Sequence, residues 1–431
     1  MAALYNMIGT DDKQAIVISL HDDTTEIIQL ADSLDYSVSY TFIQHRSTPD
    51  VKTYIGSGKI KEITQFLEAD NQISLIIVDG ELRPSQWFLL EKEFGIEVYD
   101  RIKLILMIFK HRAHRKEAQL QVRLAELEYE KPYVKELIHR ARNGEHPGLM
   151  AGGEYQVDDY FEMMKKQMKL IKNKLKKIED DHAIQRKHRH KTGFYLVSLA
   201  GYTNAGKSSL MNCVTKNEIA VKNQLFSTLS TTTRKIESDK IPILLTDTVG
   251  FIENLPAWII NAFHSTLEEI KNADLVVLVA DISDPFHIMM KKIQISIDEL
   301  HHLQVSSPIV LTLNKSDLIN RDGFVEIEKR LKENLPFSNM DLIFISVKQQ
   351  MGIEFLLNKI INLLPNMVKV TLEIPQSNEI LSFISWLYEK TYVLSISYQE
   401  TIRVSVKCSE QIKNKIDVFC KNNQGSITDV N

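Results

Sequence analysis

Residues 194–212 read FYLVSLAGYTNAGKSSLMN, and the rest of the chain is organised around this stretch. Its first residues are apolar and partly β-branched, which predicts a buried strand, and the residues from Leu210 onward predict a helix. Between them, Gly201 to Ser208 fit the eight-residue phosphate-loop pattern. A strand, loop and helix in this order favour a phosphate-binding loop over a plain glycine turn.

The residues of this loop have distinct expected roles. Gly201 and Gly206 have no side chain to keep the backbone away from a phosphate. The loop N–H groups can therefore point at the anion. Lys207 would reach the β- and γ-phosphates, and Ser208 would hold Mg²⁺. We therefore predict nucleotide contacts at Gly201, Tyr202, Thr203, Asn204, Ala205, Gly206, Lys207, Ser208 and Ser209.

A second motif follows the phosphate loop at the end of another apolar run. Residues 243–246 read ILLT and predict a strand, and Asp247-Thr248-Val249-Gly250 comes directly after it. A carboxylate at this place suits Mg²⁺ held through water, and the Gly250 N–H suits contact with a γ-phosphate. The spacing after the phosphate loop makes this Asp-x-x-Gly motif specific.

The base is expected to be guanine. The apolar strand 308–313 ends in Asn314-Lys315-Ser316-Asp317, and a carboxylate here can accept hydrogen bonds from both N1–H and the exocyclic amine of guanine. The stem of Lys315 would pack on the base, and Ser346-Val347-Lys348 would close over it. These motifs are typical of GTP-binding proteins, so GTP is favoured over ATP.

The catalytic expectation depends on a missing side chain. Ras-type hydrolysis uses a Gln directly after the glycine of Asp-x-x-Gly, and this chain has Phe251 there. We expect slow intrinsic hydrolysis that a partner or a cation completes, with Asn204 holding K⁺ beside the phosphates. Residues 226–234, FSTLSTTTR, predict a switch loop in which Thr233, or as second choice Thr232, closes on Mg²⁺. The expected catalytic set is Lys207, Thr233, Gly250 and Asn204, with Ser208, Thr233 and Asp247 as Mg²⁺ ligands.

The chain before the phosphate loop contains two further regions. Apolar runs alternate with amphipathic ones over residues 13–100, which predicts a small α/β domain with a largely parallel sheet. Within it, Gly56-Ser57-Gly58-Lys59 lacks the full phosphate-loop spacing, and a turn with a helix start is favoured over a second phosphate site. Residues 104–142 and 161–178 have apolar side chains at helical spacing, which predicts an antiparallel hairpin with a kink at Pro132.

The polar faces of the two hairpin helices are strongly basic. Beside a nucleotide switch, such a surface favours contact with nucleic-acid phosphates over a merely solvated face. The basic residues are Lys110, Arg112, Arg115, Lys116, Lys165, Lys166, Lys169, Lys172, Lys174, Lys176 and Lys177, followed by Arg186, Lys187, Arg189 and Lys191.

The expected architecture is therefore α/β with four parts. We expect an N-terminal α/β domain over 1–103, a hairpin and basic linker over 104–191, a P-loop domain over 192–365 and a small α+β domain over 366–431. The three cysteines, Cys213, Cys408 and Cys420, contain no metal-type spacing and suit free thiols in a reducing compartment. No apolar run has the length of a membrane span, so we expect a cytoplasmic protein. We also expect it to be a monomer.

The motifs resemble those of the HflX family of ribosome-associated GTPases. The resemblance covers about Tyr54 to Leu364 and is most specific upstream of the phosphate loop. It is carried by YIGSGKIKEI (54–63), ELRPSQWFLLEKEFGIEVYDR (81–101), LILMIF (104–109), RKEAQLQVRLAELEY (115–129), GYTNAGKSS (201–209), LFSTLSTTTR (225–234), DTVGFIENLP (247–256), AFHSTLEEIKNADLVVLVAD (262–281) and NKSD (314–317).

This resemblance implies a GTPase that binds the large ribosomal subunit through its N-terminal region, is stimulated by it, and in some members separates stalled ribosomes. It also implies ATP use in the N-terminal domain, with Gly56 to Lys59 as a participant. The chain departs from the family at 143–161, NGEHPGLMAGGEYQVDDYF, where most members carry a Gly-Pro-Gly-Glu-Thr-Gln-like segment, and at Val347, where Ala is usual. The alternative is a nucleotide-gated RNA-binding or ribosome-assembly module in which hydrolysis is only a reset.

Overall fold

The structure is a computed structural model that describes residues 13–69, 72–142, 154–191, 194–215, 226, 231–236, 243–253, 255–334, 341–365, 367–375, 378–398 and 401–430. The described residues form two compact units. The first comprises those that lie within Met1–Ile178 and within two later segments, Lys222–Leu229 and Asn254–Phe263. The second comprises Glu179–Val221, Ser230–Glu253 and His264–Asn431.

The first unit begins with a four-stranded sheet in the order β2-β1-β3-β4, in which every pair is parallel. Ala15, Ile16, Val17 and Ile18 in β1 are all buried, so helices cover both faces of the sheet. The small α/β domain with a parallel sheet is therefore confirmed. Its elements are β1 (Lys13–Ser19), α1 (Thr25–Asp32), β2 (Tyr36–Ile43), α2 (Ser57–Ala69), β3 (Ile73–Val78), α3 (Pro84–Phe94), β4 (Glu97–Asp100) and α4 (Arg101–Arg112).

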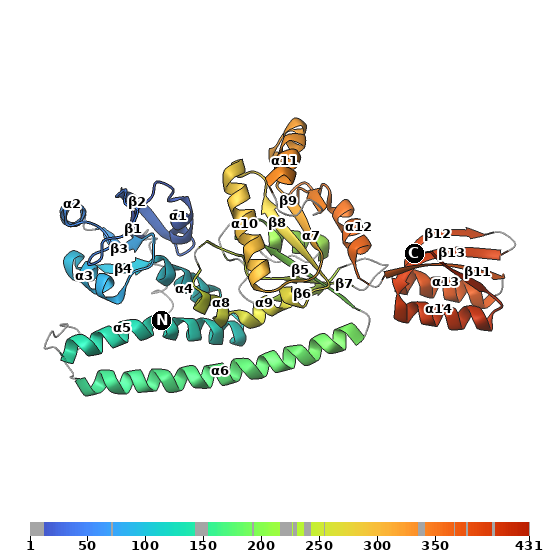
Figure 1. The fold of residues 1–431 in the computed structure, drawn as a ribbon, viewed down its shortest axis with the longest axis horizontal. Coiled ribbons are helices and arrows are strands. Elements are labelled where there is room, and N and C mark those ends of the chain that lie inside the picture. Colours follow the sequence, from blue (N-terminus) through green and yellow to red (C-terminus); the bar gives the residue numbers. More distant parts are fainter. Residues whose placement is uncertain are drawn as a thin grey trace, which may run out of the picture. The chain divides into compact units, whose positions relative to one another are not determined.

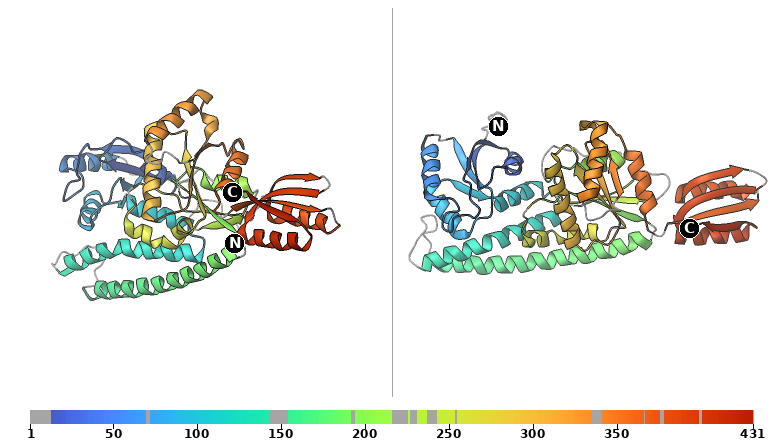
Figure 2. Two further views of the ribbon diagram at one scale, coloured as in Figure 1. Left: turned by 45° about the vertical axis from the view of Figure 1, so that its right-hand side comes forward. Right: turned by 45° about the horizontal axis from the view of Figure 1, so that its top comes forward.

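Two long helices, α5 (Lys116–Arg142) and α6 (Glu154–Lys191), form the hairpin, and they lie side by side in every view of Figures 1 and 2. Lys172 pairs with Glu128, whereas the ring of Phe161 lies beside Lys135, so the helices run antiparallel. α5 continues through Pro132 as one helix, and the chain leaves the helical state before it, between α4 and α5. The seam consists of Leu124, Leu127, Val134, Ile138, Met164, Met168 and Ile171.

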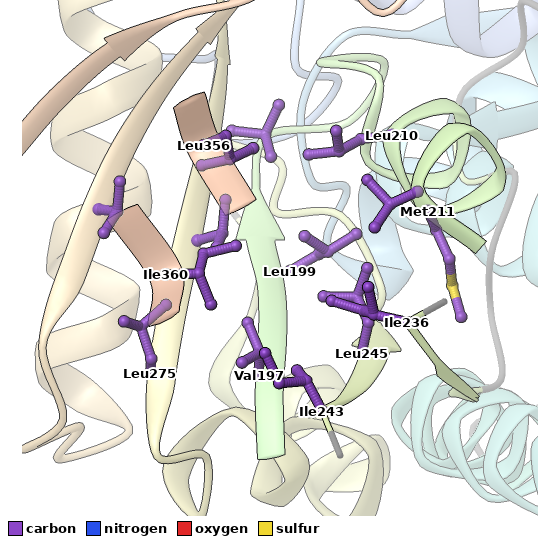
Figure 3. Close-up of a cluster of buried hydrophobic side chains, with 14 of the residues drawn as sticks. Val197, Leu199, Leu210, Met211, Ile236, Ile243, Leu245, Leu275, Leu356 and Ile360 are labelled. Atoms are coloured by element: carbon purple, nitrogen blue, oxygen red, sulfur yellow. The ribbon is translucent and has the colours of Figure 1, made fainter. Parts of the chain in front are cut away.

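The second unit contains a six-stranded sheet in the order β10-β9-β8-β5-β7-β6. Only the β6–β7 pair of this sheet is antiparallel. The apolar side chains of β5 and its neighbours form the core drawn in Figure 3. The elements are β5 (Tyr195–Gly201), α7 (Lys207–Thr215), β6 (Thr232–Lys235), β7 (Ile243–Asp247), α9 (His264–Lys271), β8 (Leu275–Asp281), α10 (Phe286–His302), β9 (Ile309–Asn314), the 3-10 turn η1 (Ser316–Leu318), α11 (Arg321–Asn334), β10 (Asp341–Phe344) and α12 (Ile353–Leu363). The short helix α8 (Ala257–Ala262) belongs to the first unit.

The C-terminal part is an antiparallel sheet in the order β12-β13-β11-β14, with both helices on one face (Figure 1). Its strand, helix, strand, strand, helix order is as the sequence predicts, and β14 adds a last strand that completes a βαββαβ unit. The elements are β11 (Met367–Pro375), α13 (Asn378–Lys390), β12 (Tyr392–Tyr398), β13 (Thr401–Ser409), α14 (Glu410–Asn422) and β14 (Ser426–Val430). Across the described ranges, no helix combines the length and the hydropathy that crossing a membrane requires.

Candidate nucleotide-binding site

The phosphate loop joins the carboxyl end of β5 to α7, in the middle of the six-stranded sheet. Gly201 has φ +135°, and a Cβ added there would lie 2.2 Å from the carbonyl oxygen of Val279 in β8. Gly206 has φ +96°, and a Cβ there would lie 2.2 Å from Asn314 Nδ2. Both glycines are therefore required by backbone conformation and by space.

Lys207 is buried at the start of α7 and points back along the loop. Its Nζ donates to the carbonyl oxygens of Gly201 at 3.0 Å and Tyr202 at 2.9 Å. Burial lowers the pKa of Lys207 to about 8, while the nearby Asp247 carboxylate opposes that shift. The ammonium group therefore lies in a site where an anion such as a phosphate would be a favourable partner.

Two of the residues expected to hold Mg²⁺ meet directly. The Ser208 hydroxyl donates to Asp247 Oδ2 at 2.7 Å, and Asp247 is the buried last residue of β7. A hydroxyl and a carboxylate are hard oxygen ligands, so this pair fits a Mg²⁺ ion that binds with a nucleotide. Within the described ranges, no group of three or more His, Cys, Asp or Glu side chains could hold a metal without a nucleotide.

The expected switch threonines lie on β6. Thr233 Oγ1 is 3.0 Å from Thr246 Oγ1, and Thr232 is the residue in register with Asp247. In this conformation the Thr233 hydroxyl thus makes a hydrogen bond with Thr246. Its role as a Mg²⁺ ligand stays a prediction, and residues 227–230 of the same loop lie outside the described residues.

The expected base-side residues are brought together by Asn314. Its Nδ2 donates to the Ala205 carbonyl at 3.0 Å, and its Oδ1 accepts from the Val347 N–H at 3.2 Å. Asp317 Oδ1 accepts from the Ser346 hydroxyl at 2.6 Å, and Lys348 is exposed at the end of the same loop. Asn314 thereby joins the phosphate loop, the Asn-Lys-Ser-Asp turn and the Ser346–Lys348 loop.

The structure also shows contacts that the sequence reasoning missed. Lys315 forms an ion pair with Asp281, the last residue of β8, which fixes the direction of the lysine stem. The sequence does place Asp281 at the end of an apolar run, and this position could have predicted that its carboxylate lies at the nucleotide-binding edge of the sheet. Tyr202 and Phe251 are paired by a parallel backbone bridge between the phosphate loop and the Asp-x-x-Gly loop, for which no sequence pattern exists.

The Gly56–Lys59 segment forms a turn and the start of α2. The Gly56 N–H donates to Gln44 Oε1 at 2.9 Å, and Lys59 pairs with Glu62 at 2.8 Å. These contacts supply the favoured turn and helix start. The ATP use that the family resemblance implies for this domain stays a prediction.

A β-sheet with a phosphate loop, an Asp-x-x-Gly strand end and an Asn-Lys-x-Asp turn defines the class of phosphate-loop GTPases. Three family models match the chain: "GTP-binding GTPase N-terminal" over 21–110, "GTP-binding GTPase Middle Region" over 112–189 and "50S ribosome-binding GTPase" over 196–315.

Curated relatives extend this match to nearly the whole chain. GTPase HflX of Methanocaldococcus jannaschii is 38% identical, over 91% of this chain and 94% of the relative. GTPase HflX of Thermococcus kodakarensis is 38% identical, over 88% of this chain and 87% of the relative. GTPase HflX of Chlamydia pneumoniae is 34% identical, over 91% of this chain and 85% of the relative. The chain belongs to the HflX family of GTPases and hydrolyses GTP.

Two solved structures align with most of the chain, with TM-scores below 0.5. A GTP-binding protein of Sulfolobus solfataricus in complex with GDP is 28% identical, covers 81% of this chain and 98% of its own, and has a TM-score of 0.46. The structure titled "SsGBP and GDP complex" is 30% identical, covers 82% and 98%, and has a TM-score of 0.49.

Nucleotide affinity is expected to weaken as the pH rises above about 8. A bound phosphate favours protonated Lys207, so the complex binds more protons than the free protein between the lowered pKa of about 8 and the ordinary value near 10.5. The GDP dissociation constant should rise by up to about tenfold per pH unit in that window and change little between pH 7 and 7.5. Fluorescence titration with a labelled GDP measures this.

The matched control for this titration is Lys207→Arg, whose guanidinium stays protonated across the window. The pH dependence of its GDP affinity should therefore come only from the protonation of the guanine base. Equal pH dependence of the two proteins would contradict the assignment of Lys207 as the phosphate ligand.

Proposed function

We propose that this chain is a Mg²⁺-dependent GTPase that binds the large ribosomal subunit, is stimulated by it, and acts in ribosome rescue, splitting or recycling. The matched family model described as a 50S ribosome-binding GTPase supports the partner. The nucleotide would be held by the loop residues 201–209, by Asn314, Lys315 and Asp317, and by Ser346–Lys348, with Ser208 and Asp247 holding Mg²⁺. The ion would neutralise charge on the phosphates.

The observation that carries the proposal is the composition of the first compact unit. Phe226 and residues 255–263 belong to it, although they flank motifs of the nucleotide site. Phe226 is the first residue of the expected switch loop, and residues 255–263 follow the Asp-x-x-Gly motif. A nucleotide that rearranges either motif would therefore act on residues that are packed with the N-terminal domain and the hairpin.

The packing of these two segments is aromatic. The ring centroid of Phe109 in α4 lies 4.7 Å from that of Phe226 and 4.9 Å from that of Phe263. Both pairs are edge-to-face, and all three rings are buried. Next to them, α8 contacts α5, with Trp258 6.5 Å from Tyr129. Edge-to-face pairs are directional, so Phe109 can hold both segments in only a narrow range of positions.

The surface of the hairpin suits a polyanionic partner. The seven lysines of α6 between 165 and 177 are all exposed. Glu162 and Glu128 pair with Lys165 and Lys172, which leaves the stripe as a whole positively charged. Ribosomal RNA is a polyanion that binds such surfaces with strong salt dependence. Residues 143–153, at the tip of the hairpin, lie outside the described residues.

Large subunits should raise the GTP turnover of the wild-type chain at least tenfold, and Phe109→Leu should lose most of this stimulation. The substitution removes the edge-to-face contacts and leaves an apolar side chain in place. Phe94→Leu is the matched control, because Phe94 is a buried phenylalanine of the N-terminal core in α3. Steady-state phosphate release with and without subunits measures the effect. Stimulation that persists in Phe109→Leu, or is lost equally in Phe94→Leu, would contradict the coupling.

Reversing the charge of Lys166, Lys169 and Lys176 to Glu should weaken binding to large subunits by about 100-fold or more and lower the salt dependence. The matched control reverses three exposed lysines outside the hairpin, Lys329, Lys332 and Lys415. Co-sedimentation at several KCl concentrations distinguishes them. If both triple variants lose binding equally, net charge and not the hairpin surface is responsible.

Basal hydrolysis should be faster in KCl than in NaCl at equal ionic strength if Asn204 holds K⁺ beside the phosphates. Asn204 has φ +63° and is exposed at the turn of the phosphate loop, so its side chain is accessible to an ion. Asn204→Ala should abolish the difference. Equal rates in the two salts would remove potassium from the mechanism.

A further inference from the structure

Asp281 is the last residue of β8 and lies outside the motifs that predict the nucleotide site. Its strand pairs with β9 so that Asp281 is in register with Asn314, the first residue of the Asn-Lys-Ser-Asp turn. The Ile282 N–H donates to the Asn314 carbonyl at 3.1 Å, which joins the chain after β8 to that turn. Asp281 therefore lies at the same edge of the sheet as the residues expected to hold the guanine base.

Both oxygens of the Asp281 carboxylate accept hydrogen bonds. Oδ1 accepts from the Ser283 N–H at 3.0 Å and from the Ser283 hydroxyl at 2.6 Å. Oδ2 accepts from Lys315 Nζ, so that the two side chains form an ion pair. The Asp281 side chain is only 13% exposed, and solvent therefore screens this pair less than one on the open surface. The carboxylate is thus held by Ser283 and in turn holds Lys315.

The backbone of Lys315 is fixed as well. It has φ +63°, in the left-handed region, which a residue with a side chain adopts only where its surroundings hold it there. Its carbonyl accepts from the Leu318 N–H at 3.0 Å, and the Ser316 N–H donates to the Ile345 carbonyl at 3.0 Å. The main chain therefore sets where the lysine side chain begins, and Asp281 sets where its ammonium group lies.

Ordering a lysine side chain has a cost in free energy. Its flexible four-carbon stem loses rotamer freedom when it packs on a base. A side chain that the protein already holds in the required place avoids this cost at the moment of binding, and the ligand binds more tightly. Because the backbone and Asp281 hold the two ends of Lys315 through contacts within the protein, the stem is ordered in advance.

We propose that Asp281 is a positioning residue for nucleotide binding, which orders the Lys315 stem and thereby raises the affinity for a nucleotide whose base packs on that stem. The choice of guanine belongs to Asp317, whose carboxylate matches N1–H and the exocyclic amine. Asp281 contributes to affinity and not to this choice. The proposal rests on the base contacts of Lys315 and Asp317 in the proposed function.

The test is the variant Asp281→Asn in the full chain. Its amide oxygen can still accept from Ser283, while the group that then faces Lys315 is a donor and cannot hold the ammonium group. The dissociation constants of GDP and of inosine diphosphate, which lacks the exocyclic amine, should both rise about fivefold, and their ratio should stay the same. Titration with labelled GDP and competition by inosine diphosphate measure this. In turnover, KM for GTP should rise while kcat stays within twofold.

A double-mutant cycle shows whether Asp281 acts through Lys315. Lys315→Ala, which removes the stem, should weaken GDP binding, and Asp281→Asn should add less than twofold in that background. If Lys315→Ala leaves the GDP affinity unchanged, the proposed placement of the base is itself wrong. If Lys315→Ala weakens binding but Asp281→Asn does not, or if Asp281→Asn has the same effect in both backgrounds, the placement stands and the role of Asp281 is wrong.

The matched control is Asp341→Asn, which breaks another ion pair of the same sheet. Asp341 pairs with Lys359 at 2.6 Å, but it is the first residue of β10 and lies at the amino end of that strand. This variant should change neither dissociation constant, and thermal melting should show that all variants are folded. An equal loss of affinity in Asp341→Asn would overturn the proposal. So would a changed ratio of the two dissociation constants in Asp281→Asn, because it would show a distorted Asn-Lys-Ser-Asp turn.

Discussion

The close approach of the phosphate loop to its neighbouring strands is the constraint on which the nucleotide site depends. Any side chain at Gly201 would collide with the backbone of β8, and any at Gly206 with Asn314 at the end of β9. These close contacts restrict the backbone of the loop, which follows the carboxyl end of β5 and carries Lys207 at that edge of the sheet. Ligands of open α/β sheets bind at that edge.

Asn314 and Asp247 extend this arrangement to the rest of the site. Asn314 joins the phosphate loop to the base-side loop through its own amide group, and Asp247 joins β7 to Ser208 on α7. A bound nucleotide would then meet strand ends on one side, and the Asp-x-x-Gly loop and the expected switch loop on the other. Phe226 and Phe263, which flank these two loops, pack on Phe109 in the unit that carries most of the basic hairpin.

Much of this could be predicted from the sequence because the signals are local. A phosphate loop, an Asp-x-x-Gly strand end and an Asn-Lys-x-Asp turn are each read from fewer than ten consecutive residues, and apolar periodicity predicts the strands and the hairpin seam. The break between α4 and α5 was not predicted, and Pro132 lies inside α5 without ending it. Single-residue rules are therefore a weak guide to where a helix ends, and the kink at Pro132 stays a prediction.

The features that the sequence could not predict are long-range backbone contacts. The Tyr202–Phe251 bridge joins two loops through N–H and C=O groups that every residue has, so no residue type marks it. The pairing of Thr233 with Thr246 likewise depends on the register of β6 against β7, which a serine- and threonine-rich segment does not specify. β14 was missed because its short polar run has little strand character by itself.

The central claim is that nucleotide state controls the binding of the hairpin unit to the large ribosomal subunit. It is tested most directly by sedimenting the full chain with purified large subunits in the presence of a non-hydrolysable GTP analogue, GDP or no nucleotide. The account predicts at least tenfold tighter binding with the analogue than with GDP, and no comparable binding to small subunits. Equal binding in all three nucleotide states, or none to the large subunit, would contradict it.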